Sequence, residues 1–93
     1  MLTPAQLRAA RSILGWTRQD LAKKSGVPAV TIRGFESLGA DSKLSTIHKM
    51  RRALEAGGVI FLDPTQLEGP GVRLEIKKEG GARYAIDGAR KKR

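Results

Sequence analysis

The side chains best suited to chemistry flank a Ser25-Gly26 turn, and they favour hydrogen bonding over covalent reactions. After the turn, Arg33 can donate two parallel hydrogen bonds to guanine, whereas Ala29 and Val30 can only pack against a thymine methyl group. A phosphate contact by Arg33 is an equally good interpretation. For a double-stranded DNA partner, the expected contacts to the edges of the bases are Pro28, Ala29, Val30, Thr31, Arg33 and Gly34.

A second set of polar and basic side chains is suited to phosphate contacts. Phosphates bind at helix N-termini and to basic or hydroxyl side chains that flank them. The charge of Arg18 favours phosphate over a base, while Lys23 and Lys24 also fit a solvated helix face. The expected phosphate contacts are Thr17, Arg18, Gln19, Lys23, Ser42, Lys43, Ser45 and Thr46.

The residue types needed for catalysis or metal binding are scarce. His48 is the only histidine and there is no cysteine, so a multi-histidine or thiolate metal site is excluded. The Gly69-Pro70-Gly71 cluster precedes no predicted helix, as a phosphate-cradling loop would require. Trp16 fits packing at the edge of a core better than ligand stacking. We therefore expect no enzymatic activity, no cofactor and no metal.

Four helices are expected to position these side chains. Thr3 and Thr17 are candidate N-caps, Pro4 suits the first helical position, and Gly15 suits a helix end. Apolar residues then recur at spacings of three and four. The expected helices cover residues 4–14, 17–25, 28–37 and 45–56.

The second and third of these helices are joined by a very short turn. Such a tight pair needs a small residue between the helices, a residue that tolerates positive φ, and an apolar seam. Ala22, Gly26 and Val27 with Ile32 meet these needs, as in a helix-turn-helix whose second helix enters the DNA major groove. The net charge of +9 favours a polyanion partner, although charge can also serve solubility.

The hydrophobic period changes after Gly58. Residues 59–62 form a short apolar run, and Val72, Leu74 and Ile76 alternate with polar residues, as in half-buried strands. A further strand over 82–86 could pair back through Gly80-Gly81. We therefore predict a mainly α fold with three parts: a helix-turn-helix domain over 1–57, a short β extension over 58–89, and a basic disordered tail over 90–93.

The predicted strands must cover their apolar face. A two-stranded hairpin alone is marginal in water, so this face covers either the helical domain or a second protomer. We predict that it builds a homodimer, which would place two DNA-binding units on one site. The expected dimerisation residues are Val59, Phe61, Val72, Leu74 and Ile76.

As a set, these residues resemble a known family. Residues 14–17, followed by Asp20-Leu21-Ala22, Gly26-Val27, Thr31-Ile32 and Phe35-Glu36, resemble the Xre/Cro/phage-repressor helix-turn-helix family. The resemblance covers residues 3–57 and extends through the helix expected at 45–56. It implies a lambda-repressor-like fold and a dimeric, sequence-specific transcriptional regulator, of the repressor or activator kind.

The resemblance also has structural implications. Members of the family pair an arginine and a glutamate at the positions of Arg11 and Glu36, which implies a partly buried bridge between two helices. Residues 58–74 resemble an extension found in a bacterial subset. Strands here replace the fifth helix that the family often has, which changes the dimer geometry that the family would imply.

Two other functions remain open. The chain could be an antitoxin or adaptor whose C-terminal strands bind a partner protein through an unpaired strand edge. It could also bind nucleic acid without sequence preference. The absence of cysteine, of a long apolar run and of a secretory signal suits a cytoplasmic, nucleoid-associated protein with no membrane partner.

Overall fold

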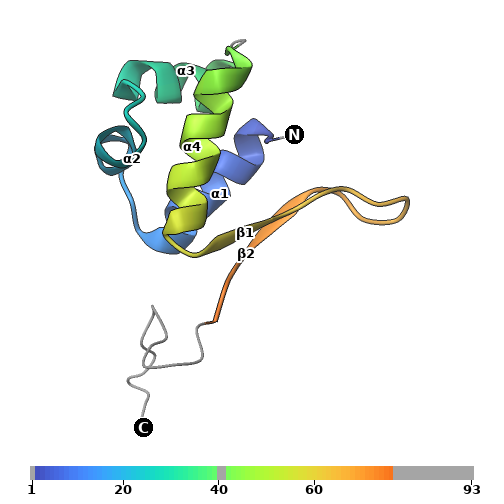
Figure 1. The fold of residues 1–93 in the computed structure, drawn as a ribbon. Helices are drawn as coiled ribbons and strands as arrows, with labels where there is room; N and C mark the ends of the chain where they lie inside the picture. Colours follow the sequence, from blue (N-terminus) through green and yellow to red (C-terminus); the bar gives the residue numbers. More distant parts are fainter. Residues whose placement is uncertain (1, 40–41, 77–93) are drawn as a thin grey trace, which may run out of the picture.

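The computed structural model describes residues 2–39 and 42–76 and is mainly helical. Four helices precede a two-stranded antiparallel sheet whose connecting loop projects away from the helices (Figure 1). This confirms the expected fold class, and each predicted helix begins and ends within one residue of its observed bounds. The elements are α1 (Pro4–Leu14), α2 (Arg18–Ser25), α3 (Ala29–Leu38), α4 (Leu44–Ala56), β1 (Val59–Leu62) and β2 (Gly71–Leu74).

Local hydrogen bonds explain where the first two helices begin. The Thr3 side chain accepts a hydrogen bond from the Gln6 backbone, and the Gln6 side chain accepts one from the Thr3 backbone. Thr17 and Asp20 form the same reciprocal pair at the start of α2. The backbone hydrogen bond from Thr17, and then that from its side chain, lower the pKa of Asp20. Both pairs satisfy backbone groups that a helix start leaves unpaired.

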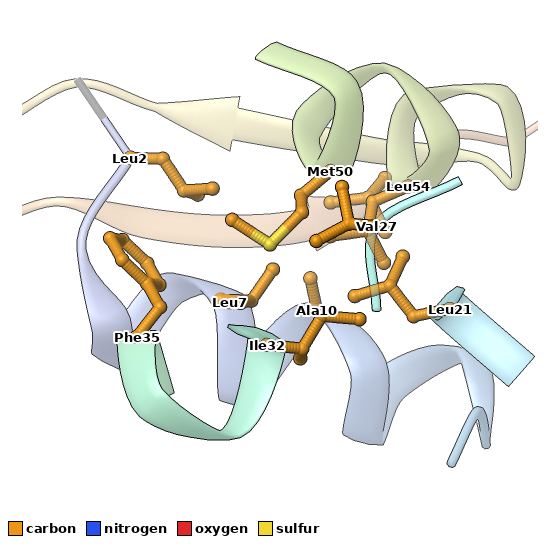
Figure 2. Close-up of a cluster of buried hydrophobic side chains, with 10 residues drawn as sticks. Leu2, Leu7, Ala10, Leu21, Val27, Ile32, Phe35, Met50 and Leu54 are labelled. Carbon is orange, nitrogen blue, oxygen red and sulfur yellow. The ribbon is translucent and has the colours of Figure 1, made fainter. Parts of the chain in front are cut away.

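The core lies where all four helices meet. Its fully buried side chains come from every helix, and Figure 2 shows them pointing toward a common centre. Val27 adds the α2–α3 turn to this core, as the predicted seam requires. The fully buried apolar residues are Leu7, Ala10, Leu21, Ile32, Met50 and Leu54.

The hairpin packs on this same core. Val59 pairs with Leu74 at the inner end of the sheet, and Leu62 pairs with Gly71 at the outer end. Val59 is buried, while Phe61, Val72 and Leu74 are half-buried against the helical core. Of the two coverings expected for this apolar face, the structure shows the helices of the same chain. The dimerisation role of these four side chains stays a prediction. Ile76 is exposed.

Two side chains fasten the hairpin to the helices. Gln6 is buried, and its Nε2 donates hydrogen bonds to the carbonyl oxygens of Leu62 (3.2 Å) and Gly71 (3.0 Å). The Arg51 guanidinium lies 5.1 Å from the centre of the Phe61 ring. The hairpin is therefore held by α1 at the pair Leu62–Gly71 and by α4 at Phe61 of β1.

Trp16 lies at the edge of the core, as expected. It is half-buried beside the end of α4, and Lys24 Nζ lies 5.0 Å from the centre of its ring. A Cβ atom at Gly57 would lie 2.9 Å from the Trp16 ring and from Leu14 Cδ1, so this close packing requires glycine.

Some expectations fall on other parts of the chain. The strand over 82–86 and the basic tail over 90–93 lie outside the described residues. Within residues 2–39 and 42–76, no helix has the length and apolar character needed to cross a bilayer. The same part of the chain contains no group of three histidine, aspartate or glutamate residues arranged to hold a metal ion.

Candidate nucleic-acid interface

The outward face of α3 carries the predicted base-contacting residues. Ile32 and Phe35 are buried in the core, so the intervening positions point away from it. Val30 is 73% exposed and Arg33 is also exposed. Of the remaining candidates, Pro28 is exposed, whereas Ala29, Thr31 and Gly34 are half-buried. The structure thus brings an apolar side chain and a guanidinium to the same exposed helix face.

A shallow groove runs along this face. It has a volume of about 150 Å³ and is lined by Val30, Arg33, Gly34, Ser37 and Leu38. Gly34 lies about one helical turn from Val30 and one turn from Leu38, and because it has no side chain a groove is left between these two residues. A flat base edge or a methyl group can approach the helix backbone here, next to the Arg33 guanidinium.

A buried carboxylate fixes the orientation of α3. Glu36 is 2% exposed, and its two carboxylate oxygens accept hydrogen bonds from Arg11 Nε (2.6 Å) and Arg11 Nη2 (2.8 Å). This is the two-point geometry that makes an arginine–carboxylate pair directional. Arg11 also donates from Nη1 to the Trp16 carbonyl oxygen (2.9 Å). The pair that the family resemblance implied therefore joins α1, α3 and the turn before α2.

Arg18 adds α2 to this cluster. Its Nε donates to Glu36 Oε1 (3.0 Å), and its Nη2 donates to Ser37 Oγ (3.2 Å). The sequence predicted only a phosphate contact for Arg18. Its charge and its position at the start of a helix do not indicate that Glu36, 18 residues away, is its partner. In the structure, its guanidinium lies against α3 and helps to hold the two helices together.

Arg8 is a member of the cluster that sequence reasoning missed. Its Nη1 donates to the Glu36 carbonyl oxygen (2.6 Å). Arg8 precedes Arg11 by three residues and therefore shares its face of α1, which was the available signal. Three arginines from two helices consequently meet the last turn of α3.

Hydrogen bonds within the cluster favour the ionised forms of Glu36 and Arg11. Burial raises the pKa of Glu36, but the hydrogen bonds from Arg11 and Arg18 outweigh it and leave the pKa below its ordinary value. The hydrogen bond to Glu36 likewise raises the pKa of Arg11. Glu36 is therefore a buried carboxylate that stays ionised because two guanidinium groups face it.

Seven of the predicted phosphate-contacting residues lie at the starts of α2 and α4, and Lys23 lies further along α2. Thr17 and Gln19 lie at the start of α2, where Arg18 contacts Ser37; the Thr17 hydroxyl already accepts the Asp20 N–H. The second group surrounds the start of α4, which follows α3 closely in the chain. There Lys43 and Ser45 are exposed, while Ser42 and Thr46 are half-buried. Lys23, with Lys24, is exposed on α2.

The chain is similar to two curated proteins. No family model matches it. It is 37% identical over 57 residues to Antitoxin HipB of Escherichia coli O6:H1 (strain CFT073), which covers 57% of this chain and 61% of that protein. The match to Antitoxin HipB of Escherichia coli K12 has the same identity and covers 65% of that protein. The chain thus spans less than two thirds of the length of these relatives.

Proposed function

We propose that this protein is a sequence-specific DNA-binding transcriptional regulator of the Xre/Cro type, in which a helix-turn-helix domain over 1–57 carries the DNA contacts. Arg33 and Val30 on α3 would read bases in the major groove, while the starts of α2 and α4 would contact phosphates. The observation that carries the proposal is the exposed α3 face, which the buried Glu36 cluster holds in a fixed orientation.

The regulator would act as a homodimer without enzymatic activity, in the cytoplasm and at the nucleoid. One helix-turn-helix covers few base pairs, and two joined units gain affinity by binding neighbouring half-sites about 34 Å apart. The net charge of +9 supports a polyanion partner such as DNA.

Selection of bound duplexes from random DNA tests this proposal. We expect the native chain to enrich an inverted repeat, and the Arg33→Ala variant to lose preference at one base pair in each half-site. A guanine contact of this kind is worth roughly 1–3 kcal/mol of discrimination. The matched control is Arg73→Ala, which removes an equally charged, exposed residue from β2 rather than from α3. If no motif is enriched, or if both variants lose preference equally, the proposal is wrong.

A second candidate function is an antitoxin or adaptor that binds a partner protein through its C-terminal strands. The name of the two relatives favours it. The hairpin has only two strands, so each strand has one edge without a further strand in the described part of the chain, and such an edge can accept a partner strand. Co-expression with a partner encoded beside this protein, followed by purification through a tag on this chain, tests it. A stable complex that survives high salt would support the adaptor function.

A further inference from the structure

The loop at the outer end of the hairpin differs in charge and polarity from the rest of the molecule. We call residues 63–70 the hairpin tip. Leu67 is 95% exposed there, more than any other large apolar side chain in the described residues. The tip carries Asp63 and Glu68 and contains no lysine, arginine or histidine, although the chain has a net charge of +9. It therefore presents one apolar side chain with two carboxylates.

Hydrogen bonds fix the shape of this tip. The Thr65 backbone donates to the Glu68 carbonyl oxygen (2.7 Å). The Thr65 hydroxyl accepts from the backbone of Leu67 (3.2 Å) and of Glu68 (3.0 Å). Leu67 is thus held outward on an ordered turn. A contact made by such a turn loses less conformational entropy than one made by a flexible loop.

A groove with matching character lies at the other end of the hairpin. It has a volume of about 240 Å³ and is lined by Trp16, Lys24, Ala53, Ala56 and Gly57. Its walls are mostly apolar and are formed by the Trp16 ring, Ala53 and Ala56. One cation, Lys24 Nζ, stands over the Trp16 ring at 5.0 Å from its centre. The groove can therefore accept one aliphatic side chain with a carboxylate beside it.

The tip of a chain cannot fill the groove of the same chain. The groove lies where α4 ends and β1 begins, whereas the tip lies at the far end of the hairpin (Figure 1). A second copy can supply the tip, and a two-fold axis would then form the contact twice. We propose that two copies of this chain dimerise reciprocally, with Leu67 of each inserted into the Trp16–Ala56 groove of the other and Glu68 paired with Lys24.

This inference rests on the proposed homodimer and names its contact surfaces. It places the contact away from the strand face first expected, because Val59, Phe61, Val72 and Leu74 cover their own helices. The tip is acidic and the chain has a net charge of +9, so the tip is attracted to a second copy of the chain. This charge complementarity favours a second copy as the occupant of the groove. Each contact is small, so two of them are needed for a stable dimer.

Directed disulfide formation tests the pairing, because the chain has no cysteine of its own. Leu67→Cys and Ala56→Cys are made in separate chains and mixed under oxidised glutathione. We expect a covalent dimer from the mixture and little from either variant alone. Equal cross-linking of the Leu67→Cys variant alone would place tip against tip and overturn the proposal. So would failure of the mixture to cross-link while sedimentation still shows a dimer.

Substitutions that alter dimer affinity provide a second test. Leu67→Asp is expected to raise the dimer Kd by about a hundredfold or more, since the two-fold axis repeats the contact and each copy loses a buried leucine. Gln66→Asp, one position earlier and also exposed, adds the same charge without removing the leucine and is expected to change the Kd far less. Lys24→Glu and Glu68→Lys should each weaken the dimer, and the double variant should restore it. An unchanged Kd for Leu67→Asp, or no rescue by the double variant, contradicts the pairing.

The same proteins separate this inference from the proposed function. If both are right, Leu67→Asp weakens binding to the full inverted repeat and leaves half-site binding unchanged. If native DNA binding is intact but Leu67→Asp still binds the full repeat normally, only the tip contact is wrong. If no DNA is bound yet the mixed cysteine variants cross-link, the proposed function is wrong and the tip contact stands.

Discussion

The helical part and the hairpin bury their apolar residues in different ways. The four helices enclose a set of fully buried side chains that they supply themselves, such as Leu7, Ile32 and Met50. The hairpin has no fully buried side chain and adds only Val59 to the buried core, and its tip extends beyond the helices with Leu67 exposed. The helical part therefore carries the stability of the molecule, whereas the hairpin depends on the helices for its own order. Changes in the two regions should differ accordingly.

The largest loss of stability is expected in the buried ion cluster. Arg11→Met removes the two hydrogen bonds that Arg11 donates to the Glu36 carboxylate and leaves Arg18 as the remaining partner of this buried group. Breaking such a pair costs about 3–5 kcal/mol. Urea unfolding of the variant measures the loss, with Arg52→Met on the exposed face of α4 as the control. If both variants unfold at the same urea concentration, Glu36 does not organise the helices.

The same carboxylate predicts how stability depends on pH. The pKa of Glu36 is lowered in the folded state, so the folded protein binds fewer protons there than the unfolded chain. Its contribution is complete above the ordinary glutamate pKa of about 4.3 and is lost as pH falls through the lower folded value. Unfolding free energies measured across the acidic range should show this decline.

Asp20 also has a lowered pKa, so its contribution must be separated. Glu36→Gln should flatten the acidic decline, while Asp20→Asn should leave most of it in place. A native profile that Glu36→Gln does not alter would show that other carboxylates cause the decline.

Two glycines offer a direct test of the contrast between the regions. Gly57 has φ −80°, which alanine adopts freely, so the effect of Gly57→Ala is purely steric. The new Cβ would lie 2.9 Å from Trp16 and Leu14, and overpacking of this kind costs about 2 kcal/mol. Gly69→Ala in the hairpin tip meets nothing within 4 Å. Calorimetry should show a lower Tm for Gly57→Ala alone; equal melting would mean that the Trp16 contact adapts without cost.

The sequence predicted the helical part well because its signals are local. Thr3, Thr17 and Gly15 mark helix boundaries through hydrogen bonds and conformations within a few residues. Periodic apolar positions then identified the core face. The position of Arg18 could not be predicted in this way, because its partner Glu36 lies on another helix and only the packed fold brings the two together.

The hairpin illustrates the same limit at longer range. The alternation of apolar and polar residues around β2 predicted an apolar face but not what covers it. A second protomer would cover this face as well as the helices of the same chain. The deciding contacts run from Gln6 to Leu62 and Gly71, which are 56 and 65 residues away in the chain. The residues proposed to contact DNA stay predictions, since their exposure on α3 agrees with base contact and does not test it.

The smallest loss of stability is expected for a substitution of Gln6. It also tests most directly how the order of the hairpin depends on the helices. Gln6→Met keeps the side-chain volume but removes both hydrogen bonds to the hairpin, at a cost of about 1 kcal/mol. Amide hydrogen exchange in β1 and β2 should then accelerate several-fold while the amides of α3 keep their protection. Gln6 also belongs to the capping pair of α1, so Thr3→Ala is the control that removes the Thr3 side-chain half of this pair and keeps the hairpin contacts. If Thr3→Ala accelerates exchange in the strands as much as Gln6→Met does, the start of α1 orders the hairpin, and the contacts to Leu62 and Gly71 are secondary.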